Sequence, residues 1–272
     1  MGYYWLASRR VKEKTGLRQG FTKNTDMINQ EKIAAVLREA GLSRWLQQSD
    51  LGRYAVAAEQ RFIQTAMPDH GQQTVAASLS ACYTWPAGTL RLGCQPQAAD
   101  IVSALPALPL ADASAGLLLL PHGLELVSGC SQNQLLREAF RVLQPYGRLV
   151  LTGFNPHSLW RGSRLWQDLD LQEQMLPLAE VKKRLQDHGF RVAEGRFMVY
   201  VPPLRHRRSL ACWRFMEAAG NRWWPHAAAI YGLVVQKTVC PLTPISAEAH
   251  GCLPEGEWIL APASGQTVAP RP

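Results

Sequence analysis

Two apolar runs separated by one amphipathic helix constrain the fold of this chain more than any other feature. Residues 117–120 are four consecutive leucines, which is typical of a strand buried on both faces of a sheet. Ser131 with Gln134 three residues later predicts a capping box at the start of a helix, which the Pro-Tyr-Gly sequence after residue 144 ends. Residues 148–154 (RLVLTGF) form the second apolar run. This order predicts a βαβ unit with parallel strands and a right-handed crossover.

The carboxyl ends of these two strands are the expected place of a functional site, because parallel α/β sheets bind ligands there. Pro121 and His122 follow the first strand, and Asn155 follows the second. His122 is the best candidate for a catalytic group, since an imidazole titrates near neutral pH and can act as a general base. The alternative is a histidine that only hydrogen-bonds a loop backbone. Asn155 is expected to cap a turn.

Several of these segments resemble class I S-adenosylmethionine-dependent methyltransferases. The Leu-Pro-Leu sequence at 108–110 and the Arg-Val-Leu-x-Pro-Tyr-Gly sequence at 141–147 match motifs of that family, with Tyr146 in place of a glycine. The segments Pro-His-x-Leu-Glu and Gly-Phe-Asn-Pro-x-Ser-Leu-Trp are similar to a narrower, poorly characterised proteobacterial subgroup of type 11-like methyltransferases. The resemblance covers residues 42–245 and is strongest over 105–160. It implies an α/β fold with a Rossmann-like, seven-stranded class I methyltransferase sheet, a reversed edge strand and an N-terminal helical extension.

The resemblance also implies where a cofactor would bind. The first two strands are expected at residues 74–79 and 88–94, with the cofactor at their carboxyl ends. The implied cofactor-binding residues are Ser78, Ser80, Ala81, Gln95, Ala104, Leu105, Leu120 and Pro121. Three features of the family's site are missing from this chain. No glycine stands in the loop after the first strand, only Gln95 follows the second strand where the family has an acid, and Ala104 replaces an adenine-binding aspartate.

These departures predict that S-adenosylmethionine binds weakly or not at all. Each missing acid removes a charge-assisted hydrogen bond worth roughly 1.5–3 kcal/mol. Losing both weakens binding by on the order of a hundredfold or more, at about 1.4 kcal/mol per factor of ten, unless Asp100 replaces one of them. Two functions therefore stay open. One is methyl transfer to an unidentified acceptor, and the other is a methyltransferase-like binding or regulatory module without catalysis.

Charge and composition narrow the choice of partners and compartment. The chain has 29 basic and 21 acidic side chains, a net charge of +8, which permits an anionic partner but is more simply a soluble basic surface. Residues 203–226 interleave arginines with Trp213, Trp223 and Trp224, so nucleic-acid contact is possible. The favoured interpretation is an insertion whose tryptophans pack against the body. No apolar run approaches the roughly 20 residues that span a bilayer, so no membrane partner is expected. Six cysteines without Cys-x-x-Cys pairs argue against a metal site and for reduced thiols in the cytoplasm.

We divide the chain into an N-terminal extension (1–41), a methyltransferase-like domain (42–245) and a disordered tail (246–272). Residues 1–26 lack a clean period and are interpreted as an upstream extension from a misplaced start codon, with a basic arm as the alternative. A helix is expected after Met27 with Gly41 as its stop. The remaining predicted elements are helices over 51–66 and 177–189, and strands over 190–201 and 228–239, the last of them antiparallel.

Overall fold

The computed structural model describes residues 30–67, 73–161, 163, 170–204 and 206–239. The expectations for residues 1–26 and 246–272 lie outside these ranges. The strands are β1 (Thr74–Ala76), β2 (Leu90–Gly93), β3 (Ile101–Val102), β4 (Ala115–Pro121), β5 (Leu143–Phe154), β6 (Phe190–Met198) and β7 (Ile230–Lys237). The helices are one over residues 30–48, α2 (Asp50–Ala66), α3 (Gly123–Leu126), α4 (Gly129–Val142), α6 (Leu178–Asp187), α7 (Arg207–Cys212), α8 (Phe215–Trp223) and the 3₁₀ turn η1 (Pro225–Ala227).

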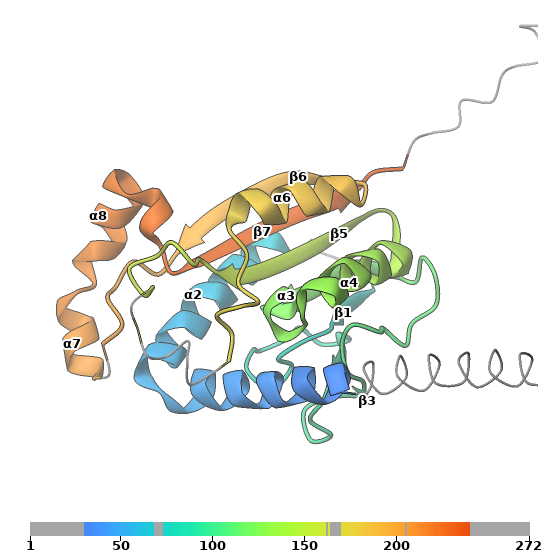
Figure 1. Cartoon of the computed structure of the whole chain (residues 1–272), viewed down its shortest axis with the longest axis horizontal. Coiled ribbons are helices and arrows are strands. Elements are labelled where there is room, and N and C mark those ends of the chain that lie inside the picture. Colours follow the sequence, from blue (N-terminus) through green and yellow to red (C-terminus); the bar gives the residue numbers. More distant parts are fainter. Residues whose placement is uncertain (1–29, 68–72, 162, 164–169, 205, 240–272) are drawn as a thin grey trace, which may run out of the picture. The chain divides into compact units, whose positions relative to one another are not determined.

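The seven strands form one sheet in the order β3-β2-β1-β4-β5-β7-β6 (Figure 1). Strands β1 to β5 pair in parallel, and β7 is antiparallel to both of its neighbours, β5 and β6. Figure 1 shows α4 and α6 on one face of this sheet and α2 on the other. The predicted seven-stranded α/β fold with a reversed strand is confirmed, and β6 forms the outer edge beyond that reversed strand.

The central βαβ unit of β4, α4 and β5 matches its prediction. All seven residues of β4 are buried, and Leu118 lies in register with Leu149 of β5. The capping box was wrong: α4 begins at Gly129, so Ser131 lies inside the helix and is buried. The N-cap is Ser128, whose hydroxyl donates to Glu31 of helix 30–48 instead of capping its own helix. A contact between distant segments thus replaces the local one that the sequence suggested.

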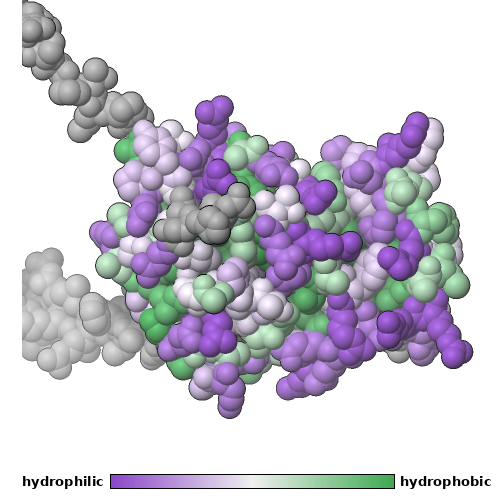
Figure 2. Space-filling view, turned by 180° about the vertical axis from the view of Figure 1, so that it is seen from behind, coloured by the Kyte–Doolittle hydropathy of each residue, from purple (hydrophilic) through white to green (hydrophobic). Residues whose placement is uncertain are grey.

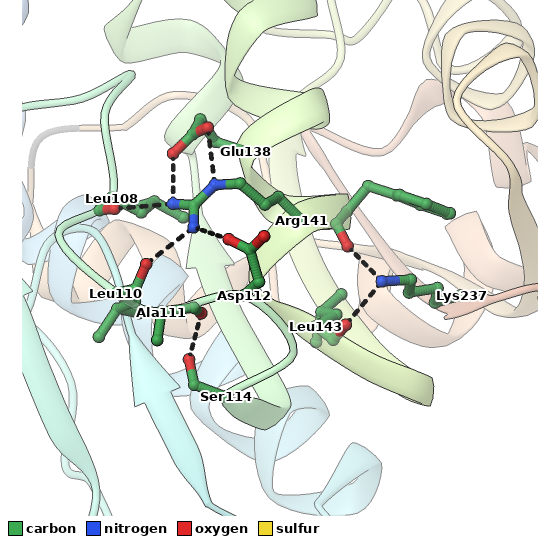
Figure 3. A network of polar contacts seen from close by, with 10 residues as sticks. Leu108, Leu110, Ala111, Asp112, Ser114, Glu138, Arg141, Leu143 and Lys237 are labelled. Carbon is green, nitrogen blue, oxygen red and sulfur yellow. Dashed lines mark hydrogen bonds and ion pairs between the residues drawn. The ribbon is translucent and has the colours of Figure 1, made fainter.

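Arg141 near the end of α4 holds the loop that leads into β4. Its guanidinium donates to the backbone oxygens of Leu108 (3.1 Å) and Leu110 (2.8 Å) and pairs with Asp112 (2.6 Å) and Glu138 (2.7 Å) (Figure 3). Hydrogen bonds from Arg141 to these two carboxylates raise the pKa of the guanidinium. All three nitrogens of the guanidinium therefore donate hydrogen bonds, and Arg141 fixes the Leu-Pro-Leu turn to α4.

Lys237 of β7 caps the C-terminal end of α4. Its ammonium donates to the backbone oxygens of Phe140 and Leu143, each at 2.7 Å (Figure 3). A cation at this position also complements the negative end of the helix dipole. The last strand of the sheet is thereby tied to the helix that precedes β5.

Helix α2 packs against the reversed strand. A Cβ atom on Gly232 of β7 would lie 2.4 Å from the ring of Phe62, so only glycine allows α2 to approach this closely. The preceding helix runs over residues 30–48, so the expected stop at Gly41 was wrong. The chain turns instead at Ser49, whose hydroxyl accepts the backbone N–H of Gly52 (2.8 Å) and caps α2.

The segment after β6 differs most from its prediction. It forms two short helices, α7 and α8, which sequence patterning did not indicate. Its tryptophans do not pack against the body: the exposed fractions are 42% for Trp213, 67% for Trp223 and 60% for Trp224. The reason is that α8 docks through its glycine, since a Cβ on Gly220 would lie 2.2 Å from the ring of Tyr200. The rings of Trp223 and Trp224 at the end of α8 are then left exposed.

No helix in the described ranges combines the length and apolar character needed to cross a bilayer. Four cysteines fall within those ranges, and all are free thiols: Cys82, Cys94, Cys130 and Cys212. The described residues also contain no group of three or more histidine, cysteine, aspartate or glutamate side chains placed to hold a metal ion.

Candidate active site

His122 stands directly after β4, at the carboxyl edge of the sheet. Its backbone is left-handed (φ 52°), and its N–H donates to the backbone oxygen of Thr152 at the end of β5 (3.0 Å). The side chain is completely buried, with its ring centroid 4.1 Å from that of Phe154. The sharp turn thus directs the imidazole into the protein interior.

Two carboxylates flank this imidazole, and a phenol hydrogen-bonds one of them. Its Nε2 lies 2.8 Å from Oε1 of Glu59 on α2, an ion pair whose alignment falls short of a hydrogen bond. Its Nδ1 hydrogen-bonds Oε2 of Glu125 on α3 at 2.7 Å. Tyr83 donates its hydroxyl to Glu59 (2.7 Å), and the backbone N–H of Phe154 donates to Glu125. We call Glu59, Tyr83, His122 and Glu125 the buried charge cluster.

The cluster fixes the protonation of His122. Burial lowers the pKa of the imidazole, but the charges of Glu59 and Glu125 outweigh it and raise the pKa to about 10. Burial raises the pKa of Glu59, but His122 and the hydrogen bond from Tyr83 outweigh it, so the pKa is lowered. For Glu125 burial prevails and the pKa is raised. His122 is therefore protonated at neutral pH, whereas a general base must be neutral. Its catalytic role stays a prediction, and its contacts are those of a positioning residue.

A pH dependence of stability follows from this raised pKa. A histidine with a higher pKa in the folded than in the unfolded chain stabilises the fold fully below about pH 6.5 and loses that contribution as the pH rises toward 10. We expect the melting temperature to fall over this range, and to fall less in His122→Gln, whose amide does not titrate. Burial raises the pKa of both facing phenols, Tyr83 and Tyr231, so neither adds to the slope below pH 10.

Differential scanning calorimetry at intervals between pH 6 and 10 measures this slope. His157→Gln is the matched control, because His157 is exposed and should leave the slope unchanged. Parallel curves for the wild type and His122→Gln would show that His122 is not the titrating group.

Helix 30–48 covers the carboxyl ends of β1 and β2. Glu39, Ser43 and Gln47 lie four residues apart, on one side of this helix. Glu39 is 5% exposed, and its carboxylate accepts the backbone N–H of Leu79 (3.2 Å) in the loop after β1. The same carboxylate also reaches the end of β2, where its Oε1 would lie 3.4 Å from a Cβ atom on Gly93. Burial raises the pKa of Glu39 in spite of the hydrogen bond from Leu79. One carboxylate from the helix therefore reaches the ends of both strands.

The cavity beside Glu39 is very small. Its volume is about 10 Å³, and its lining includes Ser80, Ala81, Gly93 and Gln95. Such a space holds about one water molecule. The hydroxyl of Ser80 donates across it to the backbone oxygen of Leu92, and a Cβ on Gly93 would lie 3.1 Å from that hydroxyl oxygen. In this conformation the chain's own side chains fill the space at the carboxyl ends of β1 and β2.

The structure brings together only some of the predicted cofactor residues. Ser80, Ala81 and Gln95 line the small cavity, whereas Ser78, Ala104, Leu105, Leu120 and Pro121 do not. The hydroxyl of Ser78 donates to the backbone oxygen of Pro121 (2.6 Å), which ties the loop after β1 to the end of β4. Asp100 does not replace a missing acid at the cavity, because it is paired with Arg91 (2.7 Å) on the surface.

Glu39 and Glu59 were not predicted as site residues, although their positions in the sequence contain a clue. Glu39 lies within the apolar stripe of helix 30–48, between the buried residues Ala35 and Leu42. Glu59 lies in the same way between Ala55 and Phe62 on α2. An unpaired charge is rarely buried, so an acid inside an apolar stripe predicts a buried partner. Asn155 behaved as predicted: its side-chain oxygen accepts the N–H of His157 (3.0 Å) in a turn.

Comparisons with known proteins address the fold. No protein-family model and no curated protein matches this chain. One similar solved structure is a chain of the complex between the Haloferax volcanii Trm112 methyltransferase activator and a methyltransferase, at 14% identity, TM-score 0.50, covering 73% of this chain and 98% of that one.

Another is an S-adenosylmethionine-dependent methyltransferase of Thermotoga maritima, described as a possible histamine N-methyltransferase. It is 15% identical, with a TM-score of 0.52, covering 72% of this chain and 93% of that one. Identities this low establish the architecture alone. They agree with the resemblance at that level and do not reach the proteobacterial subgroup, which stays a prediction. The chain has the fold of class I S-adenosylmethionine-dependent methyltransferases.

Proposed function

We propose that this chain is an S-adenosylmethionine-dependent methyltransferase of an unidentified acceptor, in which Glu39 supplies an acid that the cofactor edge otherwise lacks. The supporting observation is the position of the Glu39 carboxylate between the loop after β1 and the end of β2. In this fold the ribose of the cofactor is held by an acid after the second strand, where this chain has only Gln95. A carboxylate from helix 30–48 can make the same kind of hydrogen bond.

The conformation described does not fit the cofactor. Ligand pockets of this kind have volumes of roughly 300–1,000 Å³. The cavity at Glu39 has about 10 Å³. Binding therefore requires helix 30–48 or the loop at Ser80 to move. The protein's contribution to methyl transfer would be to position the two reactants.

The closed cavity favours a second candidate, a binding or regulatory module that has lost catalysis. In that case Glu39 is a permanent substitute for the ligand. Its carboxylate already accepts the backbone N–H of Leu79. Leu79 lies in the loop after β1, which would contact the cofactor. The two candidates predict different effects of removing this one side chain on ligand binding.

Titration with S-adenosylhomocysteine in a calorimeter distinguishes them. If Glu39 binds the ribose, the wild type binds weakly and Glu39→Ala binds roughly tenfold to a hundredfold more weakly still, the effect of one charge-assisted hydrogen bond. If Glu39 fills the site permanently, the wild type gives no heat, and Glu39→Ala binds no more weakly than the wild type. Asp100→Ala is the matched control, because Asp100 is an acid bonded to Arg91 outside the cavity. Equal or tighter binding by Glu39→Ala would contradict the proposed role.

A further inference from the structure

A second, larger cavity lies between α2 and α7. Its volume is about 560 Å³, and four arginines contribute to its lining: Arg53, Arg61, Arg207 and Arg214. The only acid in the lining is Asp50, which pairs with Arg53 (2.6 Å). No ion pair is found among the described residues for Arg61, Arg207 or Arg214. We call this cavity the arginine cleft.

Exposed aromatic rings adjoin the arginine cleft. Trp213 and Phe215 flank Arg214 in the sequence and are 42% and 64% exposed, with their rings stacked at 5.8 Å. At the far end of α8, Trp223 carries the guanidinium of Arg222 above its ring at 5.6 Å. Trp224 next to it is 60% exposed. Figure 2 shows strongly hydrophilic residues beside hydrophobic ones at the end of the molecule that carries α7 and α8.

The loop after β5 fixes the segment that carries α7 and α8 at the carboxyl edge of the sheet. Strand β6 runs in the same direction as β5, since both are antiparallel to β7, so α7 begins beyond the same edge as Asn155. The side-chain amide of Asn155 donates to the backbone oxygens of His226 (2.7 Å) and Ala228 (2.9 Å). The indole of Trp160 donates to the backbone oxygen of Val201 (2.8 Å). The aromatic rings are thus presented on a fixed support.

We propose that the arginine cleft and the exposed rings of α7 and α8 form a binding surface for single-stranded nucleic acid. Guanidinium groups bind phosphates, and exposed indole and phenyl faces stack with bases of any sequence. Helix α8 has nine residues and is about 14 Å long, at about 1.5 Å per residue. This length corresponds to about four nucleotides of a stacked strand, at about 3.4 Å each. One end of the strand would lie in the cleft and the other on Trp223.

The cleft geometry favours a nucleic acid over a membrane surface. A bilayer binds an apolar face that enters the headgroup region. Here the rings alternate with exposed Arg207, Arg208, Arg214 and Arg222, and part of the positive charge lies inside a cavity that a flat surface does not enter. The inference does not depend on methyl transfer, because it concerns binding alone.

Fluorescence anisotropy with a labelled, unstructured 15-nucleotide RNA and the full-length chain tests the proposal. The variant Arg207→Ala/Arg214→Ala removes two charges from the cleft, and Trp223→Ala/Trp224→Ala removes two rings. We expect each double variant to weaken binding by tenfold or more. The slope of log affinity against log salt should fall by about 1.4 in the cleft variant, at about 0.7 per phosphate, and stay unchanged in the tryptophan variant.

Arg148→Ala/Arg191→Ala is the matched control. Both arginines are exposed and lie in register with Gln236 on neighbouring strands, near the opposite edge of the sheet. This variant loses the same charge and should bind RNA within about twofold of the wild type. Circular dichroism confirms that each variant is folded. No binding to RNA, an equal loss in the control, or binding to phosphatidylserine vesicles in place of RNA would each overturn the proposal.

Discussion

Replacing Glu59 with alanine is expected to lower the free energy of unfolding by about 3–5 kcal/mol, the usual cost of removing one partner of a buried ion pair. The imidazolium of His122 would stay buried with one carboxylate fewer, and the hydroxyl of Tyr83 would lose its acceptor. Urea denaturation measures the loss as a lower midpoint at an unchanged slope.

Asp100→Ala is the control for this experiment, because it breaks an ion pair with Arg91 that is open to solvent. Its midpoint should stay close to that of the wild type. Glu59→Gln keeps an acceptor for the Tyr83 hydroxyl but removes the charge. Its midpoint should lie between those of Glu59→Ala and Asp100→Ala. If Glu59→Ala shifts the midpoint no more than Asp100→Ala, the buried charge cluster does not stabilise the fold.

Replacing Leu149 with aspartate is expected to prevent cooperative folding altogether. Leu149 lies in the sheet between Leu118 of β4 and Val235 of β7, and all three are fully buried. A carboxylate there has no partner and costs several kcal/mol. The free energy of unfolding of a typical domain is only about 5–15 kcal/mol. Thermal unfolding followed by circular dichroism should show no cooperative transition.

The neighbouring position provides the control. Arg148 precedes Leu149 in β5 and is exposed, so Arg148→Asp places the same carboxylate one residue away on the solvent side. This variant should fold and melt cooperatively. A soluble Leu149→Asp protein with a cooperative transition would contradict the register of the sheet.

Local patterns in the sequence were sufficient to predict the centre of the fold. Four leucines, an amphipathic helix and a second apolar run defined β4, α4 and β5, because each pattern lies within one element. Strands β1 and β2 also lie within their predicted ranges, although β1 ends at Ala76 and not at residue 79, and Ser80, Ala81 and Gln95 share one cavity. The cap of α4 was wrong because Ser128 bonds Glu31, about a hundred residues away in the sequence.

The remaining features depend on contacts between distant residues. The role of Glu39 depends on Leu79 and Gly93, and that of Glu59 on His122, and no local pattern names these partners. The exposure of Trp223 depends on the docking of Gly220 against Tyr200, which a helix of nine residues does not reveal by its period. Propensity gives the elements, and packing between elements decides which side chains meet.

The position of β7 has a consequence for the order in which the protein can form during synthesis. Strand β7 is the last described strand in the chain, yet it lies between β5 and β6 and supplies every backbone partner that β6 has in the sheet. Until Lys237 has left the ribosome, β5 presents a long unpaired edge and β6 has no neighbour. Nascent chains are prone to aggregate through such edges. This half of the sheet therefore forms only after its last strand has been made, and the edge of β5 stays unpaired while residues 155–237 are synthesised.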